Sequence, residues 1–112
     1  PSAELRDQLR ELRDLIDQLD EEIAQKLGAR MDIAERIGDY KQAHNVAIYQ
    51  PERWESIMQR QLRLCRQLGL SENFVRAFME AIHTESRRRQ GELPDGSAQP
   101  IDDRAIERPV LR

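Results

Sequence analysis

The sequence predicts an all-α protein of three helices, one very long, that pairs with a second copy as an intertwined antiparallel homodimeric bundle. Residues 2 to 42 contain no proline and keep one apolar stripe at the period of an α-helix. Two shorter segments, after Pro51 and Ser71, repeat this period, and no segment alternates as a strand would. Hydrophobic residues make up 38 %, charged residues 35 % and aromatic residues 4 % of the chain, a composition that suits long amphipathic helices.

The predicted first helix carries its stripe from residue 5 to residue 41. Its positions are Leu5, Leu9, Leu12, Ile16, Leu19, Ile23, Leu27, Arg30, Ala34, Ile37 and Lys41. A helix of about 38 residues is roughly 57 Å long, too long for two short helices of the same chain to cover. A chain of 112 residues also has difficulty enclosing both a core and a buried site alone. We therefore expect a second copy to cover the stripe.

Two shorter helices follow a loop over residues 43 to 50. The second helix is expected from Pro51, which suits a first turn, to about Leu68, with Gly69 just beyond its end. Its predicted inner face is Trp54, Ile57, Met58, Gln61, Leu64, Cys65 and Leu68. Ser71 is expected to cap the third helix, and Gly91 to end it. The stripe of this helix is Phe74, Val75, Phe78, Ile82, Ser86 and Gln90.

The domain prediction separates a helical domain over residues 1–91 from a flexible polar tail over residues 92–112. The tail contains Pro94, Gly96, Pro100 and Pro109 and has little apolar content.

Two cations interrupt the long apolar stripe. Arg30 and Lys41 are eleven residues apart, which returns to nearly the same face with a rise of roughly 16 Å. A buried cation is costly unless an anion meets it, so the pattern predicts a pocket for a small, multiply charged anion. Arg13 borders the same stripe but is about 25 Å of helix from Arg30, so it can serve that pocket only from a second, antiparallel subunit.

Other polar residues extend the set. Arg53 begins the second helix, and Ser86 and Gln90 share one face of the third. Each also has a simpler interpretation: Arg30 could pair with an acidic residue of a neighbouring helix, Lys41 could reach solvent, and Arg13 could be solvated. Ser86 could bond to its own helix, and Gln90 could fray. None of them is a convincing nucleophile or proton-transfer group.

Several functions find no support in the sequence. The net charge of −3 provides no basic field for nucleic acid, and the run Arg87-Arg88-Arg89 is expected to be a solvated helix end. His44 and His83 have no ligand-like spacing, so we expect surface histidines, no metal site and no cofactor. Cys65 lies among leucines and is expected to be a buried thiol. No transmembrane run or signal peptide is visible, and we expect a cytoplasmic protein without a membrane partner.

These residues, in this order, resemble the all-helical chorismate mutases over about residues 5 to 90. The matching pieces are Leu12-Arg13-x-x-Ile16-Asp17-x-x-Asp20, Arg30-Met31, Tyr40-Lys41, Ile48-Tyr49-Gln50-Pro51-Glu52-Arg53 and Ser86-x-x-x-Gln90. No single piece is specific, but together they match at family spacing. The resemblance implies an intertwined homodimer that converts chorismate to prephenate in the biosynthesis of phenylalanine and tyrosine.

The resemblance also implies residue roles. The arginines that match Arg13 (from the partner subunit), Arg30 and Arg53 surround the dicarboxylate substrate. Residues matching Lys41 and Gln90 donate to the ether oxygen of the breaking bond, and Ser86 matches a residue near a substrate carboxylate. A pericyclic rearrangement needs no nucleophile or cofactor, only a compact substrate conformer and well-aimed donors.

Two positions depart from the commonest family pattern. Position 50 is usually acidic and is Gln50 here, and position 54 is usually a glutamate that meets the ring hydroxyl and is Trp54 here. Gln50 could supply a side-chain or backbone contact, while Trp54 could line the pocket or pack in the core. The related isochorismate-pyruvate lyases are altered in the same region, but Ser86 favours the mutase.

A third alternative is a non-catalytic helical dimerisation module, whose buried cations pair with Asp17, Asp20 or Glu21 of a partner helix. Similar mutase domains also occur fused to the first enzyme of the aromatic pathway. The absence of a starting methionine is compatible with such an excised domain.

Overall fold

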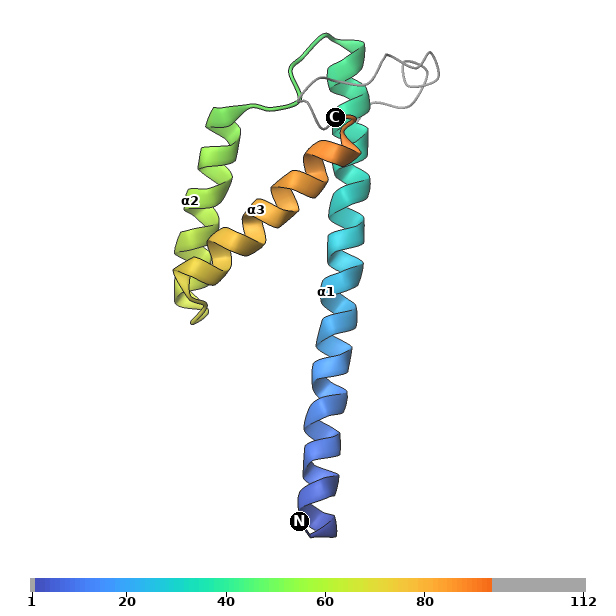
Figure 1. Cartoon of the computed structure of the whole chain (residues 1–112), viewed down its shortest axis with the longest axis vertical. Helices are drawn as coiled ribbons and strands as arrows, with labels where there is room; N and C mark the ends of the chain where they lie inside the picture. Colours follow the sequence, from blue (N-terminus) through green and yellow to red (C-terminus); the bar gives the residue numbers. More distant parts are fainter. Residues whose placement is uncertain (1, 94–112) are drawn as a thin grey trace. The chain divides into compact units, whose positions relative to one another are not determined.

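The computed structural model describes residues 2–93, and these contain three helices and no strand, as the sequence predicts. Helix α1 spans Ala3–Ala43, α2 spans Pro51–Gln67 and α3 spans Glu72–Arg89 (Figure 1). The described chain divides after Arg30 into two units. Of the tail predicted over residues 92–112, residues 94–112 lie outside the described residues.

The helix ends follow the predicted signals. Pro51 occupies the first turn of α2, and Gly69 follows its end with a φ of 78°, a left-handed conformation that favours glycine. Ser71 caps α3, since its hydroxyl accepts a hydrogen bond from the Phe74 amide at 3.3 Å. Gly91, with a φ of 101°, directly follows the C-cap of α3.

The unit of residues 2–30 is a single helical segment whose apolar side chains are exposed. Every residue from 2 to 26 is exposed. The large apolar side chains of this segment have exposed fractions between 38 % and 58 %: Leu5, Leu9, Leu12, Leu15, Ile16, Leu19 and Ile23. The predicted stripe is thus present on this segment, and its side chains are exposed.

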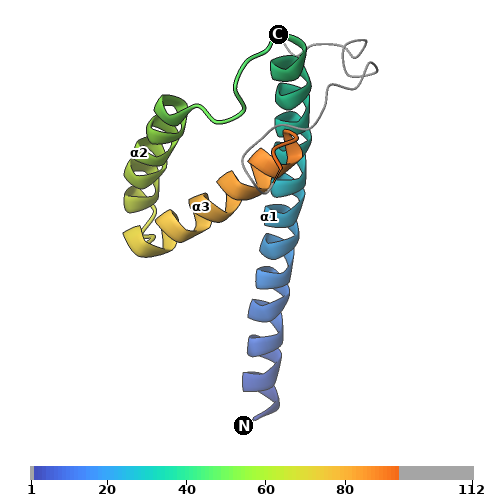
Figure 2. The same cartoon turned by 45° about the horizontal axis from the view of Figure 1, so that its top comes forward.

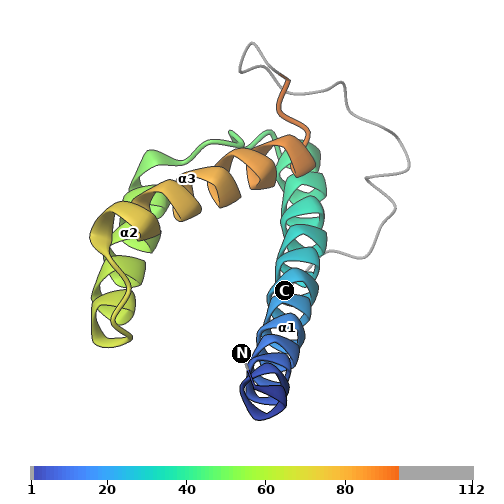
Figure 3. The same ribbon diagram turned by 60° about the horizontal axis from the view of Figure 1, so that its bottom comes forward.

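The unit from residue 31 onward contains the core. Helices α2 and α3 diverge from the turn that joins them, and the far end of α3 lies against residues 31–43 of α1 (Figures 2 and 3). The buried apolar side chains are Met31, Ala34, Ile48, Met58, Cys65, Val75, Met79 and Ile82. The prediction that Cys65 is a buried thiol is confirmed.

Within the single chain, the buried faces coincide only in part with the predicted stripes. Residues 31–43 of α1 bury Met31, Ala34 and Gly38, of which only Ala34 belongs to the predicted stripe. On α3, Met79 is buried, whereas Phe74 and Phe78 stack on each other at 5.7 Å and are 52 % and 38 % exposed. When the apolar stripe of a helix is wider than the area that its neighbour covers, the stripe predicts which side of the helix faces inward. It does not predict which edge of the stripe is buried.

The three arginines at the end of α3 also differ from the expected solvated helix end. Arg89 crosses to α1 and pairs with Asp32 at 2.9 Å and with Glu35 at 3.1 Å. Arg87 pairs with Glu92 at 2.7 Å. Only Arg88 is an exposed residue, and it pairs with Glu85 one turn earlier. Two of the three arginines therefore hold the end of α3 in place.

Candidate functional site

Lys41 and Gln90 form the centre of the candidate site. Lys41 is in the last turn of α1, and Gln90 is the C-cap of α3. The Lys41 ammonium donates to Oε1 of Gln90 at 2.8 Å and to the main-chain oxygen of Ile48 at 2.7 Å. Both contacts are partly buried. The structure thus brings together, from positions 49 residues apart, the two residues that the family resemblance implies as donors.

This geometry leaves donors for a ligand. An ammonium has three N–H donors, and the two contacts described above use two of them. Because Gln90 accepts through its oxygen, its amide nitrogen is free to turn two N–H groups toward another acceptor. A ligand oxygen next to this pair would therefore meet one charged donor and one neutral donor.

Burial shapes the charge of Lys41. Desolvation lowers the pKa of its ammonium from the usual 10.5. A lowered pKa in the folded state means that the fold binds this proton less well than the unfolded chain does. Between the lowered pKa and 10.5 the folded state therefore holds fewer protons, and this group makes stability rise with pH there. An anionic ligand would oppose the shift, because it favours the ammonium.

Further contacts fix the end of α3 beside Lys41. The side-chain amide of Gln42 donates to the main-chain oxygen of Gln90 at 3.4 Å. Ser86, one turn before Gln90, is buried, and its hydroxyl donates to the sulfur of Met31 at 3.6 Å. Ser86 thus faces α1 from the same side of α3 as Gln90.

The start of α2 supplies three of the predicted substrate-binding residues. Gln50 is the N-cap of α2 with an exposed side chain that makes no cap hydrogen bond, and Arg53 is exposed in the first turn. Trp54 stacks on the His83 ring of α3, with centroids 3.9 Å apart and an angle of 14° between the planes. Of the two interpretations left open for Trp54, packing between helices is the one that this contact supports.

A cluster of three aromatic rings and one guanidinium adjoins the site and was not predicted: Tyr49, Trp54, His83 and Arg87. The Tyr49 ring lies 5.6 Å from that of His83, and the Arg87 guanidinium lies 4.3 Å from the Tyr49 ring centre. His83 is half-buried here, so the expectation of a surface residue is wrong, whereas His44 is exposed as expected. The cluster fixes Tyr49, the neighbour of the Ile48 carbonyl that Lys41 contacts.

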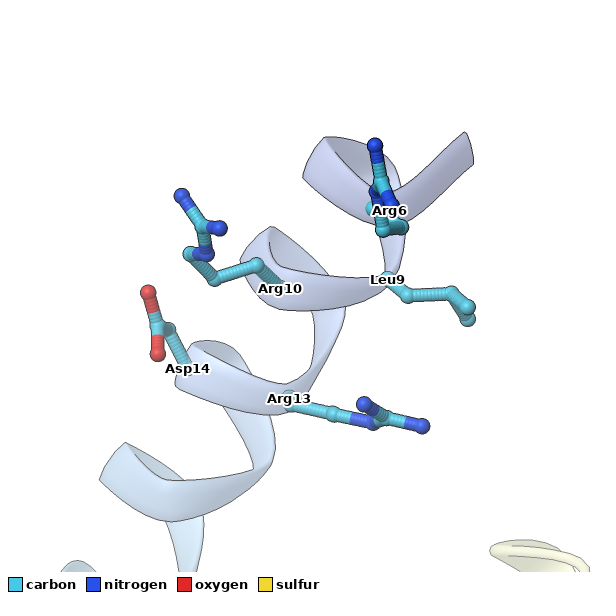
Figure 4. A pocket seen from close by; sticks show the side chains of 5 residues that line it. All are labelled: Arg6, Leu9, Arg10, Arg13 and Asp14. Carbon is cyan, nitrogen blue, oxygen red and sulfur yellow. The ribbon is translucent and has the colours of Figure 1, made fainter. Parts of the chain in front are cut away.

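Arg13 and Arg30 belong to the N-terminal unit. Arg13 is exposed and lines a shallow hollow on the helix surface with Arg6, Leu9, Arg10 and Asp14. In Figure 4 the Arg13 side chain extends to the same side as Leu9 of the apolar stripe, whereas Arg10 and Asp14 point elsewhere. Arg30 is half-buried. These positions agree with Arg13 bordering the stripe.

Residues 2–93 contain no group of three or more His, Cys, Asp or Glu side chains that could hold a metal ion. Within the same residues no helix is long and apolar enough to cross a membrane.

The part of the chain that the structure describes is all-helical and brings an ammonium and an amide together, partly buried, where α1 meets α3. The sequence matches the chorismate mutase type II family over residues 12–91. The chain therefore belongs to this family.

Individual relatives differ in name and in length. The chain is 42 % identical over 62 residues to a bifunctional chorismate mutase/prephenate dehydratase of Aquifex aeolicus, a match that covers 55 % of the chain and 17 % of that relative. It is 30 % identical over 95 residues to a 4-amino-4-deoxychorismate mutase of Streptomyces pristinaespiralis, covering 85 % of the chain and 74 % of the relative.

A third relative is an isochorismate pyruvate lyase of Pseudomonas aeruginosa, 36 % identical over 76 residues, covering 67 % of the chain and 74 % of the relative. No solved structure matches the chain significantly.

Proposed function

We propose that the chain is a chorismate mutase, which rearranges chorismate to prephenate in phenylalanine and tyrosine biosynthesis. The Lys41–Gln90 pair is the observation that carries this proposal, because it holds two donors at one partly buried point. In the rearrangement the ether oxygen of the breaking C–O bond gains negative charge. Donors fixed beside that oxygen stabilise the transition state more than the ground state.

The remaining residues are proposed to bind the two carboxylates. Arg30 and Arg53, with Arg13 from a partner subunit, would supply the positive charge, and Ser86 a hydroxyl. Gln50 would line the ring side of the pocket, and Trp54, packed on His83, would support that side. Guanidinium groups suit this task, since their planar donors match a carboxylate. Holding the substrate in its compact conformer would then lower the barrier without a cofactor.

The proposal is tested by measuring the decay of chorismate absorbance with the purified chain. Isochorismate in a parallel reaction with pyruvate detection tests the lyase, a candidate supported by the Pseudomonas relative. 4-Amino-4-deoxychorismate in a third reaction tests the candidate supported by the Streptomyces relative. We expect chorismate to be the preferred substrate. Much faster turnover of isochorismate or of 4-amino-4-deoxychorismate would refute the mutase proposal.

We also propose that the chain works as a homodimer, in which the partner covers the exposed apolar stripe of residues 5–23. Seven large apolar side chains on one exposed helical segment form an apolar surface of the kind that soluble monomers rarely expose. We also propose a fused or associated aromatic-pathway domain, upstream of the chain, and the bifunctional relative from Aquifex fits the fusion.

Folding and dimerisation are therefore expected to be coupled. Sedimentation should give a dimer at micromolar concentration, and the melting temperature should rise with protein concentration, because association stabilises the fold. The Leu12→Asp variant places a charge in the stripe and should lower both the fraction of dimer and the melting temperature. A helical, cooperatively melting monomer at micromolar concentration would refute the dimer.

The Gln90→Glu variant is expected to move activity toward acid pH. Beside Lys41, the new carboxylate would ionise readily, and an ionised carboxylate accepts but cannot donate. Protonation restores a donor, so kcat should be lowest at neutral pH and recover as pH falls toward the carboxyl pKa. Gln59→Glu, the same change on the exposed side of α2, should keep the wild-type profile. A kcat profile for Gln90→Glu parallel to wild type would show that this amide does not donate.

A further inference from the structure

Gly38 is buried where α1 meets the end of α3. A Cβ atom built on Gly38 would lie 2.5 Å from Cα, 2.6 Å from the main-chain oxygen and 2.9 Å from the carbonyl carbon of Gln90. All three are main-chain atoms, so no side-chain rotation of Gln90 relieves the overlap. Only glycine permits this approach of the two helices.

The approach involves the same residue that binds Lys41. Gln90 contacts Gly38 through its main chain, while its side chain accepts from the Lys41 ammonium at 2.8 Å. Ordinary contact of a Cβ atom begins at 3.4 Å, so any side chain at position 38 must push the Gln90 main chain away by about 1 Å. The Lys41–Gln90 hydrogen bond cannot keep its length through such a shift unless other groups move as well.

The surrounding contacts would confine the shift. Arg89 remains tied to Asp32 and Glu35, and α2 remains packed on α3. A displacement at position 90 is therefore expected to alter the last turn of α3 rather than the whole unit.

We propose that Gly38 is a positioning residue, which sets the distance between the Lys41 ammonium and the Gln90 amide by letting the two helices meet main chain to main chain. This proposal rests on the proposed mutase function. A glycine in the middle of a helix destabilises it relative to alanine, so its place here is explained by what the close approach permits. Gly38 itself would touch no substrate.

The test is the Gly38→Ala variant with Gly28→Ala as its matched control. Both replace a glycine of α1 by alanine, but a Cβ at Gly28 meets nothing within 4 Å. For Gly38→Ala we expect kcat for chorismate to fall about ten- to a hundredfold with a smaller change in KM, because a 1 Å displacement of a catalytic group is that costly. Gly28→Ala should keep wild-type kcat.

A double variant separates positioning from general packing. If Gly38 acts through Gln90, adding Gly38→Ala to Gln90→Ala should lower kcat little further, since the donor is already gone. If kcat of the double variant falls by the product of the two single decreases, the proposal is wrong. A wild-type kcat in Gly38→Ala, or its complete unfolding by circular dichroism, would also overturn it, because the expected displacement is local.

Amide hydrogen exchange provides a readout that does not depend on turnover. The amides of Gln90 and Gly91 bond to the carbonyl oxygens of Ser86 and Arg88 at 2.9 and 3.0 Å. Gly38→Ala should speed hydrogen exchange at these two amides and leave exchange in the middle of α3 unchanged. Exchange at the two amides as slow as in the wild-type chain would contradict the inference. A wild-type chain that does not turn over chorismate would instead refute the proposed function, with the exchange result still testing Gly38.

Discussion

Replacing Lys41 by alanine is expected to lower kcat for chorismate about 10²- to 10³-fold while the dimer stays folded. The ammonium is the only charged donor of the Lys41–Gln90 pair, and a charged donor stabilises developing negative charge more than a neutral amide does. Gln90→Ala should therefore lower kcat less. Because burial lowers the pKa of Lys41 in the free chain, wild-type kcat/KM should also fall on the alkaline side below the pH at which an ordinary lysine titrates.

The chain offers a matched control in its other lysine. Lys26 is exposed on the same helix, so Lys26→Ala removes an equal charge without touching the pair. Its kcat should equal that of wild type, and circular dichroism should show the same helix content in both variants. Near-full turnover in Lys41→Ala would refute the mechanism even if the fold is right.

Mixing two inactive variants is expected to restore activity. If Arg13 acts in the partner's site, an Arg13→Ala chain paired with an Arg30→Ala chain places both defects in one site and leaves the other intact. Random pairing makes half of the dimers mixed, so roughly a quarter of all sites should recover. Steady-state turnover of chorismate, measured after joint refolding, gives this fraction.

The control for this experiment keeps both arginines in one chain. A double variant lacking Arg13 and Arg30, mixed with wild type, gives mixed dimers in which each site carries one defect. Its activity should come from the wild-type homodimers alone. If the two single variants stay as inactive together as they are apart, Arg13 does not act in the partner's site.

Local chemistry explains why the helices could be predicted from the sequence. Pro51, Gly69 and Ser71 determine helix ends through the backbone of one or two residues, so their effect does not depend on the rest of the fold. Lys41 and Gln90 were recognisable because a polar residue on an apolar stripe is costly without a partner. Their mutual hydrogen bond agrees with that reasoning.

Tertiary packing explains what the sequence did not reveal. The Ile48 carbonyl is a main-chain acceptor, and no side chain marks it. His83 lies off the predicted stripe, yet it is covered by Trp54 and Tyr49, because α2 and the preceding loop pack on that side of α3. Gly38 carries no signal in the sequence beyond being a glycine inside a long helix. Its role depends on Gln90, 52 positions later in the chain.

Proton NMR of the reaction products shows whether the chain converts chorismate to prephenate. Chorismate incubated with the wild-type dimer should give prephenate in equal amount, with no pyruvate, and the Lys41→Ala dimer should leave most of the substrate unchanged over the same period. Unchanged chorismate with the folded wild-type dimer, or pyruvate as the main product, would refute the proposed mutase activity.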